Sequence, residues 1–218
     1  MRSLRAKRAL DLAISIPALI VSLPVQAAVG VAVARRLSRP VLFRQRRPGL
    51  HGEPFTMLKF RSMLPVDPAR GWVDDESRMT DFGRRLRATS LDELPALWNV
   101  VRGDMSLVGP RPLLMHYLPL YSPEQARRHD VKPGLTGLAQ VSGRNAISWE
   151  AKLALDVRYV DTRSLGLDLK ILLATVRSIL RREGITAEGH VTTAEFTGSA
   201  SGTDAANAAT GEPGSGTP

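Results

Sequence analysis

The chain carries, at residues 83–112, the stretch GRRLRATSLDELPALWNVVRGDMSLVGPRP, around which the rest of the sequence can be organised. An adjacent acid pair, Asp92 and Glu93, lies in this stretch with arginines on both sides. An ordinary ion-pair network has this composition. Phosphoryl transfer also requires it, because one carboxylate can attack phosphorus, the other can hold a divalent cation, and guanidinium groups can spread the charge. The flanking arginines are Arg84, Arg85, Arg87 and Arg111.

The local pattern around the acid pair predicts the start of a helix. Ser90 and Glu93 have the spacing of a capping box, and Pro95 suits one of the first helical positions because it lacks an N–H. The helix would then begin close to Asp92 and stop at Gly103. The acid pair would only complement the positive end of the helix dipole. The same helix start also suits a bound phosphate. Local physics alone therefore leaves a structural cap and an active site equally open.

Longer motifs separate the two interpretations. They follow one another along the chain as Phe43-Arg44-Gln45, Lys59–Met63, Thr89–Pro95, Leu97–Val100, Gly103–Pro112, Val131–Gly137 and Ala139–Asn145. Together they resemble the bacterial sugar transferases of the small monotopic phosphoglycosyl transferase family. The resemblance covers residues 5–198, which is all but the ends of the chain.

The resemblance implies a reaction and a site. The enzyme would transfer a sugar 1-phosphate from a UDP-sugar to undecaprenyl phosphate and release UMP, through a covalent phosphosugar-aspartate intermediate. Asp92 would be the nucleophile, and Glu93 would help to hold Mg²⁺. Arg87 and Arg111 would grip phosphate oxygens. Lys59 and Arg61, which alternate along an expected strand, are weaker candidates for the same role, because two such charges are often only a solvated strand face.

Composition points to an anionic partner. The 218 residues carry a net charge of +9 and have a pI of about 10.7. Only 5% of the residues are aromatic and they do not alternate with the basic ones, so the pattern is not that of a nucleic-acid stacking surface. Phosphorylated substrates and an anionic membrane surface are the expected partners. The absence of cysteine excludes disulfides, thiolate nucleophiles and Cys-ligated zinc.

Residues 12–34 form an uncharged apolar run of 23 residues, long enough to cross a bilayer as a helix. Both flanks are basic, which draws both ends toward the cytoplasm. Pro17 and Pro24 each remove a helical hydrogen bond. A bent, re-entrant hairpin in one leaflet fits these facts better than a spanning anchor or a signal peptide, and the family resemblance implies a monotopic helix as well. The family has a Ser-Pro pair at the break, which is interrupted here as Ser22-Leu23-Pro24; the exact position of the break therefore stays open, with Pro24 as the best candidate.

The fold class expected is α+β and mostly helical: the membrane hairpin, a short β-hairpin and amphipathic interface helices around one small catalytic domain. Val41–Arg46 and Phe55–Arg61 read as the two strands, and Pro65–Ser77 as a mobile loop. Leu113–Tyr121 suits either the membrane interface or the core. The spacing of apolar residues predicts helices at residues 150–159 and 168–181. The domain boundaries expected are 1–36 for the membrane hairpin, 37–197 for catalysis and 198–218 for a disordered tail.

The substrate and location follow from the resemblance too. Glu188–Thr193 with Glu195-Phe196 resembles the carboxyl-terminal signature of members acting on diacetylbacillosamine-type acetamido sugars. The enzyme would work at the cytoplasmic face of the bacterial inner membrane. Two other function classes stay open: a non-catalytic, membrane-docked basic scaffold that binds anionic lipid or nucleic acid, and a glycosyl transferase that moves sugar alone and releases UDP.

Overall fold

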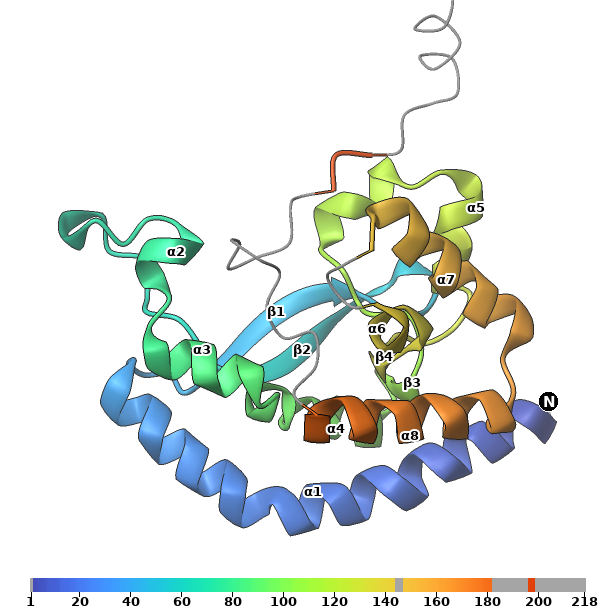
Figure 1. Ribbon diagram of the computed structural model, residues 1–218, viewed down its shortest axis with the longest axis horizontal. Helices are drawn as coiled ribbons and strands as arrows, with labels where there is room; N and C mark the ends of the chain where they lie inside the picture. Colours follow the sequence, from blue (N-terminus) through green and yellow to red (C-terminus); the bar gives the residue numbers. More distant parts are fainter. Residues whose placement is uncertain (1, 144–146, 182–195, 199–218) are drawn as a thin grey trace, which may run out of the picture.

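The computed structural model describes residues 2–143, 147–181 and 196–198. Its largest element is the helix α1, Arg2–Arg36, which lies along one side of the molecule beneath everything else (Figure 1). The remaining helices and 3-10 turns are short apart from the last two: η1 Leu50–Gly52, η2 Pro68–Arg70, α2 Asp75–Arg78, α3 Asp81–Ala88, η3 Leu91–Glu93, α4 Ala96–Arg102, η4 Met115–Leu120, α5 Pro123–Ala126, η5 Arg127–His129, α6 Leu138–Ser142, α7 Trp149–Thr162 and α8 Leu165–Arg181.

Helix α1 is continuous through both prolines, so the expected break in the helix is absent, while its re-entrant placement in a membrane stays a prediction. The helix instead bends in its middle (Figure 1). Two residues before Pro24, the Ser22 hydroxyl donates to the Leu19 carbonyl at 3.0 Å and accepts from the Gln26 amide at 2.9 Å. These side chains add hydrogen bonds within the helix next to Pro24. The bend is therefore accommodated within one helix.

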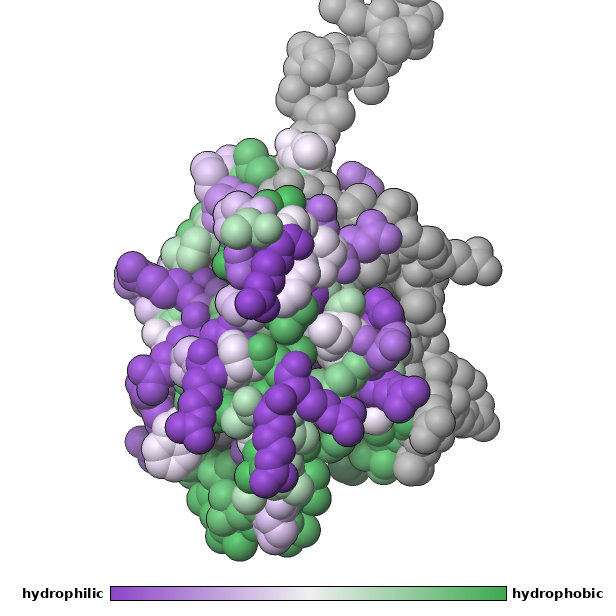
Figure 2. Space-filling view, turned by 90° about the vertical axis from the view of Figure 1, so that its left-hand side faces the viewer, coloured by the Kyte–Doolittle hydropathy of each residue, from purple (hydrophilic) through white to green (hydrophobic). Residues whose placement is uncertain are grey.

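The first turns of α1 attach it to the rest of the protein through polar contacts. Arg8 donates to the carbonyls of Val100 and Val101, at 2.6 and 2.7 Å, where α4 ends. Asp11 is 5% exposed and accepts from the Ser106 hydroxyl and the Leu107 N–H, both at 3.0 Å. Beyond these turns α1 is apolar and largely uncovered. A hydrophobic band runs along the lower edge of the molecule, below a surface rich in hydrophilic residues (Figure 2).

This uncovered surface has the properties of a membrane-facing one. Helix α1 is long and apolar enough to cross a bilayer by length and composition, and little of its apolar window is buried. Helix α8 adds a second exposed apolar stripe at helical spacing. Exposed apolar patches of this extent mark interaction surfaces in soluble proteins. The exposed side chains are Ile16, Ile20, Val21, Leu23, Val25 and Val31 on α1, and Leu165, Leu169, Leu173, Val176 and Ile179 on α8.

The predicted β-hairpin is confirmed as strands β1, Leu42–Pro48, and β2, Pro54–Phe60, which pair antiparallel. A second pair was not foreseen: β3, Ser106–Val108, runs parallel to β4, Gly134–Thr136. The two predicted carboxyl-terminal helices are confirmed as α7 and α8. The expected loop 65–77 contains short elements, with Asp74 and Ser77 forming a capping box at the start of α2.

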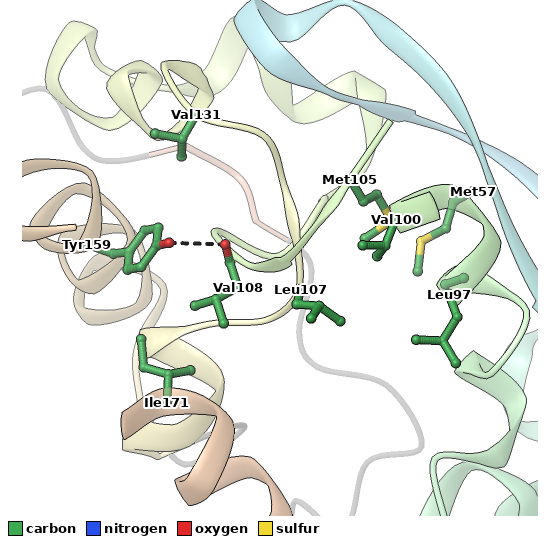
Figure 3. Packing of buried hydrophobic residues seen from close by; sticks show 10 residues of the cluster. Met57, Leu97, Val100, Met105, Leu107, Val108, Val131, Tyr159 and Ile171 are labelled. Carbon is green, nitrogen blue, oxygen red and sulfur yellow. Dashed lines mark hydrogen bonds between the residues drawn. The ribbon is translucent and has the colours of Figure 1, made fainter. Parts of the chain in front are cut away.

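The main hydrophobic core joins the β-hairpin, α4, the β3–β4 pair, α7 and α8 around Met57, Val100, Met105 and Val108 (Figure 3). Tyr159 of α7 reaches this core and its hydroxyl donates to the Val108 carbonyl at 3.1 Å. A smaller cluster buries Tyr117 of η4 with Leu153 and Phe196. Within the expected segment Leu113–Tyr121, residues Met115–Leu120 form the 3-10 helix η4, which packs inward through Tyr117. Of the carboxyl-terminal signature, Glu188–Thr193 and Glu195 lie outside the described residues, whereas Phe196 is described; residues 199–218 of the expected tail lie outside them too.

Candidate active site

The acid pair lies on a 3-10 turn and not inside the α-helix expected there. The backbone of Ser90 is left-handed, with φ of +55°, and its side chain makes no capping hydrogen bond, so the predicted capping box is wrong. The turn η3 covers Leu91–Glu93, and α4 begins only at Ala96 after Pro95. Proline at this point supplies no N–H, which allows the tighter turn to precede the helix. As predicted, Gly103 ends α4, with φ of +94°.

Asp92 is the buried member of the pair, at 6% exposure. Burial is the largest influence on its pKa and raises it to about 6, with the neighbouring Glu93 as a second cause, while Lys59, Arg87 and Arg111 act in the opposite direction. The site thus holds a carboxylate that is poorly solvated but surrounded by cations. Such a group is ionised near neutral pH and retains nucleophilic character.

Glu93 forms an ion pair with Arg111, whose guanidinium donates to Glu93 Oε1 at 2.6 Å. The backbone around Arg111 is fixed from several sides. The Gly134 N–H donates to the Pro110 carbonyl at 2.9 Å, and Arg128 donates to the Arg111 carbonyl at 2.7 Å. Arg128 is itself buried and paired with Asp156 at 2.6 Å. The parallel strands and this second ion pair therefore hold Arg111 against the acid pair.

Arg87 reaches the site from the last turn of α3. Its Nε donates to the Ser62 hydroxyl at 2.9 Å. Helix α3 approaches this segment closely, since a Cβ on Gly83 would lie only 2.0 Å from the Ser62 carbonyl oxygen. The strand β2 brings Lys59 from another side. Burial, and then repulsion from Arg111, lowers the pKa of Lys59 to about 8.

The structure brings together five of the six site residues predicted from the sequence, and the sixth, Arg61, lies apart from them. Asp92, Glu93, Arg87, Arg111 and Lys59 are near enough to influence one another's charge. Arg61 lies just after β2, and its Nε donates to the Pro40 carbonyl at 3.0 Å, at the exposed end of the hairpin.

Sequence reasoning missed Arg47, which lies close to Glu93 and Arg111, and the buried pair of Arg128 and Asp156, which holds the Arg111 backbone. It also missed Asp11, which attaches α1 to Ser106 and Leu107. A charged residue inside the apolar amino-terminal helix was the available signal for Asp11. Arg47 alternates with Gln45 along β1, which was the signal that it shares a face with that residue.

The residues of the acid pair fit a magnesium ion. Among the described residues, no group of three or more His, Cys, Asp or Glu side chains comes together. Mg²⁺ does not need one, because it is commonly held by one or two carboxylates, with waters and substrate phosphates as its other ligands. Glu93 supplies a carboxylate of this kind, beside cations that suit the phosphates. The donor set therefore fits Mg²⁺ bound together with a nucleotide diphosphate.

Comparison with known proteins agrees with this geometry. Residues 2–182 match the family model described as "Bacterial sugar transferase". The "Uncharacterized sugar transferase EpsL" of Bacillus subtilis is 60% identical over 171 residues, which is 78% of this chain and 85% of that protein. A "UDP-glucose:undecaprenyl-phosphate glucose-1-phosphate transferase" of Caulobacter vibrioides is 44% identical over 186 residues, covering 80% of this chain and 69% of that protein.

The "Undecaprenyl-phosphate galactose phosphotransferase" of Salmonella typhimurium is 40% identical over 196 residues, which is 82% of this chain but 41% of that longer protein. The matched region includes the hairpin, the acid pair and the helices that enclose it. The chain therefore belongs to the bacterial sugar transferase family, whose members are phosphoglycosyl transferase enzymes.

Proposed function

We propose that the protein transfers a sugar 1-phosphate from a UDP-sugar to undecaprenyl phosphate, as the first membrane step in assembling a glycan. The relatives from Caulobacter and Salmonella carry names for this kind of reaction with glucose and galactose. The observation that carries the proposal is the buried carboxylate of Asp92, next to Glu93 and surrounded by cations. A cap or a surface ion pair would not need a buried carboxylate whose pKa is raised.

The reaction has two displacements at the same phosphorus. A carboxylate oxygen of Asp92 attacks the phosphorus nearest the sugar; the new O–P bond forms as the bond to the UMP oxygen breaks, and UMP leaves with the electron pair. An oxygen of the lipid phosphate then attacks the phosphosugar-aspartate, and Asp92 leaves as a carboxylate. Covalent catalysis of this kind divides one difficult transfer into two easier ones. Near neutral pH Asp92 is mostly ionised, since its pKa is about 6.

The surrounding side chains have separate tasks. Arg87 and Lys59 would neutralise the oxygens of the transferring phosphoryl group, and Arg111 would do so while it orients Glu93; their closeness to Asp92 supports this role. Mg²⁺, held by Glu93 together with the diphosphate, would supply further charge neutralisation. Arg61 is the weakest of the proposed phosphate ligands, because its hydrogen bond points it to the Pro40 carbonyl.

The membrane surface explains where the reaction takes place. The phosphate of a polyprenyl acceptor lies at the lipid boundary, whereas the nucleotide donor is soluble. The exposed apolar faces of α1 and α8 would lie in one leaflet, with the basic flanks of α1 at its cytoplasmic surface. The bent α1 would then enter and leave on the same side, at the cytoplasmic face of the bacterial inner membrane.

The donor sugar is proposed from the carboxyl-terminal motif. Glu188–Thr193 resembles the signature of members that use N-acetylated amino sugars such as diacetylbacillosamine. The names of the relatives from Caulobacter and Salmonella favour a neutral hexose, glucose or galactose, as a second candidate.

The purified chain in lipid nanodiscs, incubated with undecaprenyl phosphate, Mg²⁺ and a panel of UDP-sugars, distinguishes these functions. We expect UMP as the nucleotide product, with an acetamido sugar as the preferred donor. Release of UDP would instead identify a transferase that moves sugar alone. No nucleotide release from any donor would leave the membrane-docked scaffold as the better account.

A further inference from the structure

Arg47 lies on the same face of the β-hairpin as Lys59. In the register of β1 and β2, Phe43 is opposite Lys59 and Arg47 is opposite Phe55. Side chains alternate between the two faces of a strand, so these four residues share one face. Phe55 packs against the main hydrophobic core, which includes Leu97 of α4. Arg47 thus lies on the side of the hairpin that covers the core and the acid pair, about 13 Å along the strand from Lys59.

The guanidinium of Arg47 has an unusual set of partners. One terminal nitrogen donates to Gln45 Oε1 at 2.7 Å, and Gln45 is neutral. Its Nε is buried and makes no hydrogen bond, and no carboxylate in the described ranges of the chain lies within ion-pair distance of Arg47. The buried Arg128, by contrast, has Asp156 at 2.6 Å. Arg47 as a whole is half-buried. A half-buried cation whose inner nitrogen has no partner is costly, so an anion from outside the chain would complete this environment.

The charges around Arg47 indicate where such an anion would lie. Burial, and then repulsion from Arg111, lowers the pKa of Arg47 to about 10, while Glu93 acts in the opposite direction. Arg47 therefore lies near the ion pair of Glu93 and Arg111. The cations that act most strongly on Asp92 are Lys59, Arg87 and Arg111. Arg87 therefore lies on the side of the site nearer to Asp92, and Arg47 lies on the side nearer to the ion pair of Glu93 and Arg111.

We propose that Arg47 binds the phosphate of the UMP leaving group. The inference rests on the proposed function, in which Asp92 attacks the phosphorus nearest the sugar. In such a displacement the attacking and leaving oxygens lie roughly in line on opposite sides of the phosphorus. As the bond to Asp92 forms, the electron pair of the breaking bond moves to an oxygen of the UMP phosphate. Arg47 is the cation placed to receive that charge, while Arg87 and Lys59 hold the group that is transferred.

Binding of UMP to the full chain in nanodiscs, measured by isothermal titration calorimetry, tests the proposal. We expect Arg47→Gln to weaken UMP binding by about 10-fold to 100-fold, the range for losing a charge-assisted hydrogen bond. Binding of uridine should change less than twofold, because uridine has no phosphate. The matched control is Arg46→Gln, which removes the same charge from the next residue, exposed on the opposite face of β1.

Three results would overturn the inference: UMP affinity of Arg47→Gln equal to that of wild type, an equal loss for uridine and UMP, or an equal loss in Arg46→Gln. If Arg47→Gln does not fold, Arg47→Lys keeps the charge but loses the planar fork and should bind UMP several-fold more weakly than Arg46→Lys; equal affinities would overturn it. Wild-type protein that releases no UMP from any donor removes the proposed function itself. If the wild-type protein releases UMP but Arg47→Gln binds UMP as tightly as wild type does, only the assignment of Arg47 is removed.

Discussion

Replacing Asp92 by asparagine should make the protein more stable at alkaline pH. Burial raises the pKa of Asp92 from 3.8 to about 6 in the folded protein. The folded state therefore binds this proton more tightly than the unfolded chain, so the stabilisation is complete below pH 3.8 and is lost as the pH rises through 6. One pKa unit corresponds to about 1.4 kcal/mol, so ionised Asp92 lowers the free energy of unfolding by about 3 kcal/mol at pH 8. Asparagine has no charge to desolvate and avoids this cost.

Thermal unfolding in nanodiscs with EDTA, at pH 8 and at pH 4, measures the effect. Asp92→Asn should unfold at a higher temperature than wild type at pH 8, and the difference should nearly disappear at pH 4. The matched control is Asp81→Asn, because Asp81 is exposed and the Arg84 hydrogen bond lowers its pKa. That control should give no stabilisation at pH 8. An Asp92→Asn variant less stable than wild type at pH 8, or equally stabilised at both pH values, would refute the reasoning about burial.

The same pKa predicts that the rate of covalent labelling by a UDP-sugar, followed by intact mass, falls about tenfold between pH 8 and pH 5, with a midpoint near 6; a midpoint near 4 would contradict it. Asp11→Ala leaves the Ser106 hydroxyl and the Leu107 N–H buried without their acceptor, so the free energy of unfolding should fall by about 2–5 kcal/mol in a denaturant titration. Asp11→Asn should recover most of it, and equal losses in both variants would argue against the hydrogen bonds. Gly83→Ala places a Cβ 2.0 Å from the Ser62 carbonyl and should destabilise the fold by about 1–3 kcal/mol, whereas Gly166→Ala, which meets nothing within 4 Å, should not. Equal effects of the two alanines on melting temperature would be inconsistent with that close approach.

The features predicted correctly are those with a local physical signal. Alternation of side chains marked both strands of the hairpin, helical spacing marked α7 and α8, and Gly103 marked the end of α4. The β3–β4 pair had no comparable signal. Each strand has three residues, and Ser106 pairs with Gly134 far along the chain, so only the tertiary fold reveals them.

Around the acid pair, the structure depends on tertiary contacts that the local sequence pattern does not contain. The spacing of Ser90 and Glu93 suggested a capping box, but Ser90 adopts a left-handed backbone and the turn tightens before Pro95. The approach of Lys59 and Arg87 to Asp92 depends on β2 and α3, so it followed from the family resemblance and not from spacing. The continuity of α1 through its prolines also depends on contacts that hydropathy alone does not contain.

The central claim is that Asp92 becomes covalently attached to a phosphosugar, and intact-mass spectrometry of the protein tests it most directly. Wild-type protein incubated with Mg²⁺ and its UDP-sugar donor, without lipid acceptor, should gain the mass of one sugar phosphate as one equivalent of UMP is released. Asp92→Asn should gain nothing, and undecaprenyl phosphate should remove the adduct from the wild type. Release of UMP without any gain in mass, or the same gain in Asp92→Asn, would contradict the claim.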